Sequence, residues 1–436
     1  MRNIAILLTA TALAACGGDA QSVSGTATVG GSTAGTTTTS SSDPYTQFAA
    51  PTVAKTYSGI GGSQAFDYVT DLRFCCGQQA QTFGANTSTV RSSGISISYD
   101  PSNAVFTLLV KDPNSGASTE TRFQDPAART NFGGAVEPQW GVPNLANTNY
   151  HYLQAGDGNP LSPYSSSGAG LTSPGTNSYP VDGQSGSTYQ STDLFYETPT
   201  TTGTGTSTRY VSLAGYIRNS LSWADLPLSN GGSTKQMKWH LERGAFAYGM
   251  LTDPAAVPKT GTGTYTGTML ATMVYNPTID GSYGAVLPTY FQWIEGTSTT
   301  TVNFATSAVT LGLAGTATGP AIDYAQLHDP TTGAFTGIQP YAGSTASTIA
   351  AGTSFIASGT ATINLVNTGG FTGQIASASF GATTNGAPTA INIAGSTING
   401  AFFGPAAEEV GGGFHIVGGT PDQRIDIVGG FKGKKP

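Results

Sequence analysis

The sequence predicts an all-β protein that ends in an antiparallel β-barrel, and three observations carry this prediction. Only 9% of the 436 residues are charged, and 60 are glycines. Exposed helices favour Glu, Lys, Arg and Ala, whereas strands and turns favour the Thr, Ser and Gly that are abundant here. Short segments with alternating apolar residues recur, and few long windows have helical spacing. The length is typical of two domains.

The first 15 residues have the features of a signal peptide. Arg2 supplies a positive start, and the apolar segment 4–13 is too short to span a bilayer as a helix. The small residues of "LAAC" then lead to Cys16, which resembles the lipobox of bacterial lipoproteins. This resemblance implies cleavage before Cys16 and a lipid anchor on Cys16. Gly17 stands where an Asp would resemble an inner-membrane retention signal, so the outer membrane is expected. The alternative is an ordinary secretory signal with an incidental cysteine.

Residues 16–42 are predicted to be a flexible tether, because Gly, Ser and Thr dominate them and cannot bury a core. The fold is then expected in 43–436, with a β-rich domain over 43–243 and the barrel over 244–436. Cys75 and Cys76 are adjacent in the first domain. Export to an oxidising compartment permits disulfides, so a vicinal bridge, an intermolecular bridge and two buried thiols remain open.

Two segments of the first domain have clear strand patterns. "GISISYDPSNAVFTLLV" (94–110) predicts a hairpin, because alternating isoleucines precede the turn residues of 100–103 and an apolar return strand follows. "TRYVSLAGYIRN" (208–219) predicts a further strand.

The stretch 141–193 is different, because it is rich in Asn, Gly, Pro, Ser and Tyr. Long connections of this kind are often functional or disordered, and this composition is typical of adaptable binding loops. Its densest aromatic cluster is Tyr150, His151 and Tyr152, which we expect to contact a ligand. The alternatives are an insertion without a partner, and a ligand contact made by the barrel loop 328–344.

Strand patterns become denser in the last domain. Alternating segments occur over 261–275, 301–317 and the final 80 residues, and turns join most of them. Closure into a barrel would remove the exposed edges of such a sheet. In "RIDIVGG", Ile425 and Ile427 are expected to share one face and Asp426 and Val428 the other.

The segment "FFGPAAEEVGG" (402–412) is predicted to be a helical corner between two strands. Gly404-Pro405 suits the start of a helical turn, and Gly411 could end it with a positive φ. Glu408 and Glu409 are adjacent and point in different directions, so they form a poor catalytic pair.

Composition and motifs exclude several functions. The net charge of −7 argues against nucleic-acid binding. The sequence contains no nucleophile elbow, zinc-protease motif, phosphate loop or dinucleotide fingerprint, so no enzyme, catalytic residue or cofactor is predicted. The four histidines are far apart in the chain, and no metal site is predicted. His151 is the only candidate contact for haem or a metal.

"GAFFGPAAEEVGGGF" and the terminal "VGGFKGKK" resemble the carboxyl-terminal barrel of the transferrin-binding protein B family. The resemblance is strong over 397–436, fair over 261–317 and weak over 50–240, and the lipobox and tether agree with it. It implies a β-rich handle domain followed by an eight-stranded antiparallel barrel, placed on the cell surface. The chain has room for one such lobe, whereas transferrin-binding members have two, and no transferrin-contact loop matches.

The resemblance therefore implies a surface lipoprotein that binds a solute, haem or an iron-carrying protein for nutrient uptake. An outer-membrane TonB-dependent receptor is the expected partner. The alternative is an adhesin or structural lipoprotein that captures no solute.

Overall fold

The computed structural model describes residues 44–71, 81–124, 145, 150–156, 188–200, 205–277, 279, 289–318, 322–323, 349–381 and 389–436. Cys16, Cys75, Cys76 and the loop 328–344 lie outside them. Within these ranges the one helix is α1 (Pro44–Ala49), and every other regular element is a strand. The predicted all-β class is confirmed. No helix in these ranges is long and apolar enough to cross a membrane.

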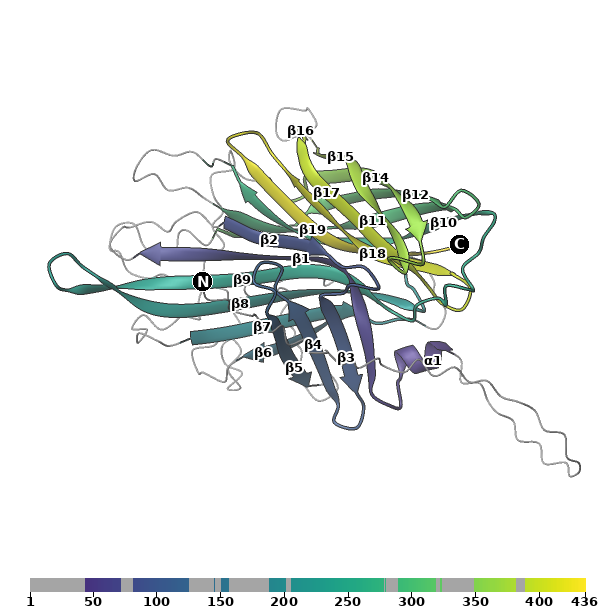
Figure 1. Ribbon diagram of the computed structural model, residues 1–436, viewed down its shortest axis with the longest axis horizontal. Helices are drawn as coiled ribbons and strands as arrows, with labels where there is room; N and C mark the ends of the chain where they lie inside the picture. Colours follow the sequence, from purple (N-terminus) through teal and green to yellow (C-terminus); the bar gives the residue numbers. More distant parts are fainter. Residues whose placement is uncertain are drawn as a thin grey trace, which may run out of the picture. The chain divides into compact units, whose positions relative to one another are not determined.

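The first sheet, which we call the handle sheet, runs in the order β5-β4-β3-β1-β9-β8-β7-β6, and β2 pairs separately with β1 (Figure 1). Its strands are β1 (Lys55–Asp71), β2 (Gln81–Thr87), β3 (Ile95–Asp100), β4 (Val105–Lys111), β5 (Ser118–Gln124), β6 (Tyr150–Gly156), β7 (Thr188–Glu197), β8 (Val211–Pro227) and β9 (Ser233–Gly249). β3 and β4 form the hairpin predicted over 94–110.

β1 belongs to both halves of the handle sheet. Residues 55–59 pair with β3, and residues 60–71 pair with β9. The sheet curls so that β5 approaches β6, and one buried apolar core lies inside the curl. That core includes Ile97, Leu108, Phe123, Leu153 and Phe246. The opposite face of β6–β9 is left to pack on the barrel.

The second sheet closes into the predicted eight-stranded antiparallel barrel. Its order is β10-β19-β18-β17-β15-β14-β12-β11, and β10 pairs again with β11 to close the ring. The strands are β10 (Thr262–Asn276), β11 (Tyr290–Asn303), β12 (Ala308–Ala317), β14 (Ser354–Asn364), β15 (Gly370–Phe380), β17 (Ile393–Phe403), β18 (Glu409–Gly418) and β19 (Arg424–Lys434). The two-residue strands β13 (Ile322–Asp323) and β16 (Thr389–Ala390) pair with β11 and β15. The domain boundary predicted between residues 243 and 244 falls inside strand β9, which belongs to the handle sheet.

Side chains fill the barrel interior. β14 alternates exposed and buried residues along most of its length, as expected for a strand with one face inside a barrel. Phe355, Phe371, Phe402, Phe414 and Phe431 join one continuous buried cluster. Among the described residues the barrel interior is therefore a packed core rather than a ligand cup.

The faces of β19 agree with the sequence. Ile425 and Ile427 belong to the barrel core. Val428 points the other way, because a Cβ added at Gly62 of β1 would lie 2.7 Å from the Val428 Cβ. β1 and β9 lie against β18 and β19, so this outer face of the barrel packs on the handle sheet.

The corner at 402–412 lies between two strands, as predicted, but the helical turn was wrong. Phe403 of β17 pairs directly with Glu409 of β18, and the residues between them form a tight turn rather than a helix. The positive φ angles occur at Gly404 (86°) and Ala407 (59°), whereas Gly411 lies inside β18 without one. The proposed helix stop at Gly411 was therefore also wrong.

Candidate functional site

β6 carries the three predicted contact residues and divides them between its two faces. Alternation along a strand places Tyr150 and Tyr152 on one face and His151 on the other. Tyr150 and Tyr152 pack against Phe195 of β7, with ring centroids 6.3 and 5.9 Å apart. His151 stacks on Tyr196 at 5.6 Å. The three residues therefore contribute to two different environments.

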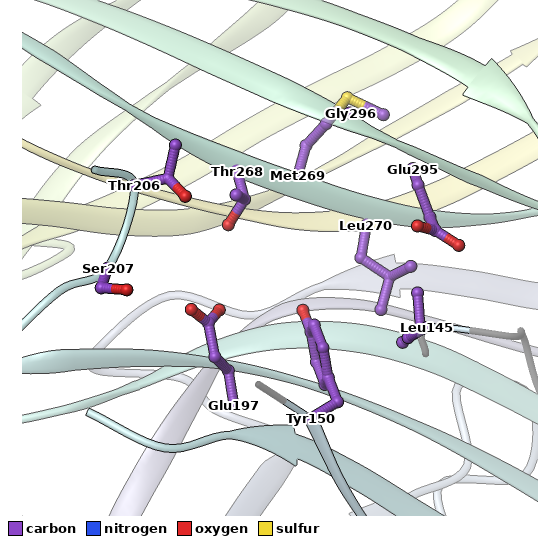
Figure 2. A pocket seen from close by; sticks show the side chains of 10 residues that line it. All are labelled: Leu145, Tyr150, Glu197, Thr206, Ser207, Thr268, Met269, Leu270, Glu295 and Gly296. Atoms are coloured by element: carbon purple, nitrogen blue, oxygen red, sulfur yellow. The ribbon is translucent and has the colours of Figure 1, made fainter. Parts of the chain in front are cut away.

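Tyr150 lines a cavity of about 190 Å³ between the handle sheet and the barrel, which we call the seam cavity. Figure 2 shows Tyr150 and Glu197 pointing from the handle toward barrel strand β10. The lining consists of Leu145, Tyr150, Glu197, Thr206, Ser207, Thr268, Met269, Leu270, Glu295 and Gly296. Sites for drug-sized ligands usually exceed about 300 Å³. The seam cavity is therefore suited to waters or a small polar group.

The seam cavity contains two carboxylates in different surroundings. Burial raises the pKa of Glu295 to about 7. Glu197 forms an ion pair of 2.9 Å with Lys432 of β19, and both side chains are almost fully buried. Burial raises the pKa of Tyr150 well above its usual range, and the charges of Glu197 and Glu295 add to this shift. Tyr150 is therefore a neutral hydrogen-bonding group.

Glu409 joins the barrel to the start of β8. Its two carboxylate oxygens accept hydrogen bonds from the backbone N–H groups of Arg209, Tyr210 and Val211, at 2.5, 2.7 and 2.9 Å. Near this contact, the ammonium group of Lys432 donates a hydrogen bond of 2.8 Å to the Thr208 hydroxyl. Adjacent Glu408 instead accepts from the backbone N–H of Ala406, within its own turn. These contacts are structural, and the sequence did not indicate which of the two glutamates would bind the handle.

A second and larger cavity of about 390 Å³ lies inside the handle, and we call it the aromatic cavity. It lies between α1, β1, β3, β4, β7 and β9. Six aromatic side chains line it: Phe48, Tyr57, Tyr99, Phe106, Tyr196 and Tyr248. This volume falls within the usual range for small-molecule sites, which are mostly apolar with a few polar groups.

Ring contacts define the walls of the aromatic cavity. Tyr99 packs on Phe106 with centroids 4.4 Å apart, and Phe106 packs on Tyr196 at 5.2 Å. Phe48 of α1 meets Tyr57 edge-on at 5.2 Å. Burial raises the pKa of Tyr57, so its hydroxyl stays protonated and can donate. Such a cavity can hold a planar or apolar group and fix it with tyrosine hydroxyls.

Sequence reasoning missed the aromatic cavity, although it named one neighbour of it. His151 lies behind the cavity wall through its contact with Tyr196. The wall residues come from α1 and five separate strands, so no local motif unites them. The available signal was the presence of the aromatic residues Tyr99 and Phe106 in the hairpin predicted over 94–110.

No protein-family model and no curated protein matches the chain. Among solved structures, a double mutant of transferrin binding protein B from Haemophilus parasuis is 11% identical, with a TM-score of 0.26 and coverage of 88% of this chain and 76% of that chain. The corresponding protein from serogroup B Neisseria meningitidis is 11% identical, with a TM-score of 0.23 and coverage of 88% and 77%. A surface lipoprotein is 13% identical, with a TM-score of 0.19 and coverage of 50% and 76%. A curled handle sheet packed against a closed eight-stranded barrel is the architecture that the sequence resemblance implied, and the strand order of the chain has both parts.

Proposed function

We propose that this protein is a ligand-binding lipoprotein of the bacterial outer surface, and that its handle sheet contacts the ligand. The observation that carries this proposal is the contrast between the two β-structures. The handle contains an aromatic cavity of about 390 Å³, whereas the described barrel interior is a continuous packed core. A ligand therefore finds preformed space in the handle.

The shape and chemistry of the aromatic cavity favour a ligand that presents a planar or apolar group. Six aromatic rings supply large contact areas at a low entropy cost. A solute, a haem or the side chains of an iron-carrying protein could each present such a group. The proposed role is capture for nutrient uptake, with a TonB-dependent receptor in the outer membrane as partner and the Cys16 lipid as anchor.

Tyr150, His151 and Tyr152 enter this proposal in different ways. His151 supports the wall residue Tyr196, so His151→Ala should weaken ligand capture modestly. Tyr150 and Tyr152 face the smaller seam cavity and its surroundings. Tyr150→Phe should therefore leave capture unchanged. The opposite pattern would assign the ligand to the seam cavity.

The test uses the mature chain from residue 16 with Cys16→Ser, immobilised and exposed to iron-loaded and iron-free extracts. Phe106→Ser removes a cavity wall, and Ile356→Ser is the matched control, because Ile356 is 57% exposed on the barrel. Capture of one ligand should fall about tenfold with Phe106→Ser and persist with Ile356→Ser. Thermal unfolding of both variants checks that they are folded. Capture that is insensitive to Phe106→Ser would place the ligand outside the aromatic cavity, and no capture at all would favour the adhesin alternative.

A further inference from the structure

Four ionisable side chains meet on the curled side of the handle sheet, away from both cavities. Asp67 of β1 pairs directly with His240 of β9, and Glu242 follows His240 on the same face of β9. Asp112, at the end of β4, reaches the same place. The chain thus brings three carboxylates around one imidazole from three separate segments.

Three atoms of this cluster converge at the spacing of metal ligands. The His240 Nε2 atom lies 3.0 Å from Asp112 Oδ2 and 3.4 Å from Glu242 Oε1, and one ligand atom from each residue lies within 4.8 Å of the others. With Zn–N and Zn–O bonds of about 2.0–2.1 Å, neighbouring atoms of a tetrahedral site lie roughly 3.3 Å apart. The described side chains need little movement to surround an ion.

In each of the three side chains, the second polar atom, which is not among the converging ones, has a partner of its own. His240 Nδ1 contacts Asp67 Oδ1 at 2.8 Å. Glu242 Oε2 accepts a hydrogen bond of 2.6 Å from buried Arg218. Asp112 Oδ1 accepts from the backbone N–H groups of Asn114 and Ser115, both at 2.7 Å. Outer contacts of this kind orient the ligands of metal sites, and a carboxylate behind a histidine is the most familiar of them.

A separate observation concerns Tyr216, on the same face of neighbouring β8. Tyr216 is fully buried, and the hydrogen-bond partner of its hydroxyl among the described residues is Ser63 of β1. Burial raises the pKa of Tyr216 well above its usual range, and the negative charges of Glu242 and Asp112 add to the shift. A tyrosine hydroxyl can both donate and accept a hydrogen bond. A water bound to an ion at the cluster would give this hydroxyl a second partner.

We propose that Asp112, His240 and Glu242 bind one divalent transition-metal ion, with Asp67 and Arg218 as orienting residues. Imidazole favours ions such as Zn²⁺ over Mg²⁺ and Ca²⁺. The His240 side chain is 37% exposed, which gives the ion a path from solvent and leaves room for water ligands. The sequence predicted no metal site. Of the three proposed ligands, only His240 and Glu242 are close in the chain, two positions apart on one strand face.

The ion would act as a structural cross-link in the handle. Asp112 belongs to the half of the handle sheet built from β3–β5, and His240 and Glu242 belong to the half built from β6–β9. One ion would join the two halves across the curl. Because an ion that binds only the folded chain stabilises it, Zn²⁺ should raise the melting temperature.

The test is calorimetric titration of Zn²⁺ into the untagged mature chain from residue 16 with Cys16→Ser, after treatment with a chelator. Asp112→Asn and His240→Gln remove one ligand each. His415→Gln is the matched control, because His415 also contacts a carboxylate, Asp426 at 3.0 Å, but no second carboxylate of the described residues converges on it. Cys75 and Cys76 are present in every protein, so any zinc that they bind is common to all.

We expect the unaltered cluster to bind one Zn²⁺ and to raise the melting temperature, with Mg²⁺ having no such effect. Asp112→Asn and His240→Gln should weaken this binding by about tenfold or more, and His415→Gln should not. Equal Zn²⁺ affinity and equal thermal stabilisation in the His240→Gln protein would overturn the proposal. His240 would then be a protonated ring that bridges carboxylates as ion pairs.

Discussion

Gly411 shows why one residue of the triple glycine cannot carry a side chain. A Cβ at Gly411 would lie 2.7 Å from Ala247 Cβ and 2.8 Å from Val211 Cγ2, both on the handle sheet. Such distances are below van der Waals contact, so the barrel and handle would have to separate. The sequence located this glycine near a corner, but it could not show that a second sheet packs against it.

Gly411→Val should therefore destabilise the protein by about 1–3 kcal/mol through overpacking. Gly395→Val is the control, because a Cβ there meets no atom within 4 Å and Gly395 has no positive φ. Urea unfolding of both variants measures the difference. Equal midpoints for the two would mean that the handle and barrel do not approach closely at Gly411.

Glu409 and Glu408 offer a second matched pair, at adjacent positions. Glu409→Gln replaces one carboxylate oxygen with an NH₂ group facing backbone N–H donors, and should cost about 1–3 kcal/mol. Glu408→Gln should change the free energy of unfolding little, because Glu408 accepts one bond inside a surface turn. Urea unfolding again gives the measurement. A Glu408→Gln protein that is the less stable of the two would contradict the assigned roles.

At the scale of elements, β11 places Glu295 beside the seam cavity, where its pKa is about 7. The folded protein keeps this proton at pH values where the unfolded chain, with the ordinary value of 4.5, has lost it. The contribution of Glu295 to stability is therefore present below about pH 4.5 and is lost as the pH rises through about 7. Glu295→Gln should stabilise the protein more at about pH 8 than at about pH 5.

Urea unfolding at the two pH values measures this difference, with Glu408→Gln as the control variant. A Glu295→Gln protein whose stability relative to the parent is the same at both pH values would show that Glu295 is ionised in the folded state throughout this range.

Features that depend on local sequence could be predicted, and features that depend on the pairing of distant strands could not. The hairpin β3–β4 and the barrel strands followed from alternation and turn residues, because both are local properties of the chain. The cavities and the His240 cluster depend on which strands become neighbours. Asp112 and His240 are 128 positions apart and meet only because the handle sheet curls. No local spacing records that. The Tyr150–Tyr152 stretch is divided between two faces for a local reason, because it lies in strand β6 rather than in the loop that was expected there.

At the scale of the whole molecule, the anchor prediction concerns Cys16. If Cys16 is the lipidated residue, Cys16→Ser should leave an unprocessed precursor that takes up no labelled palmitate. Cys75→Ser is the control and should be processed and labelled normally. Normal labelling of the Cys16→Ser protein would point to an ordinary secretory signal instead.

The central claim is that the handle, rather than the barrel interior, receives the ligand. The measurement that tests it most directly is the affinity of the captured ligand for the Phe106→Ser and Ile356→Ser proteins, side by side with the parent. Loss of about tenfold in affinity with Phe106→Ser alone is the result we predict, because Phe106 contacts both Tyr99 and Tyr196 in the cavity wall. Unchanged affinity with Phe106→Ser, together with loss when the barrel loop 328–344 is shortened, would contradict it.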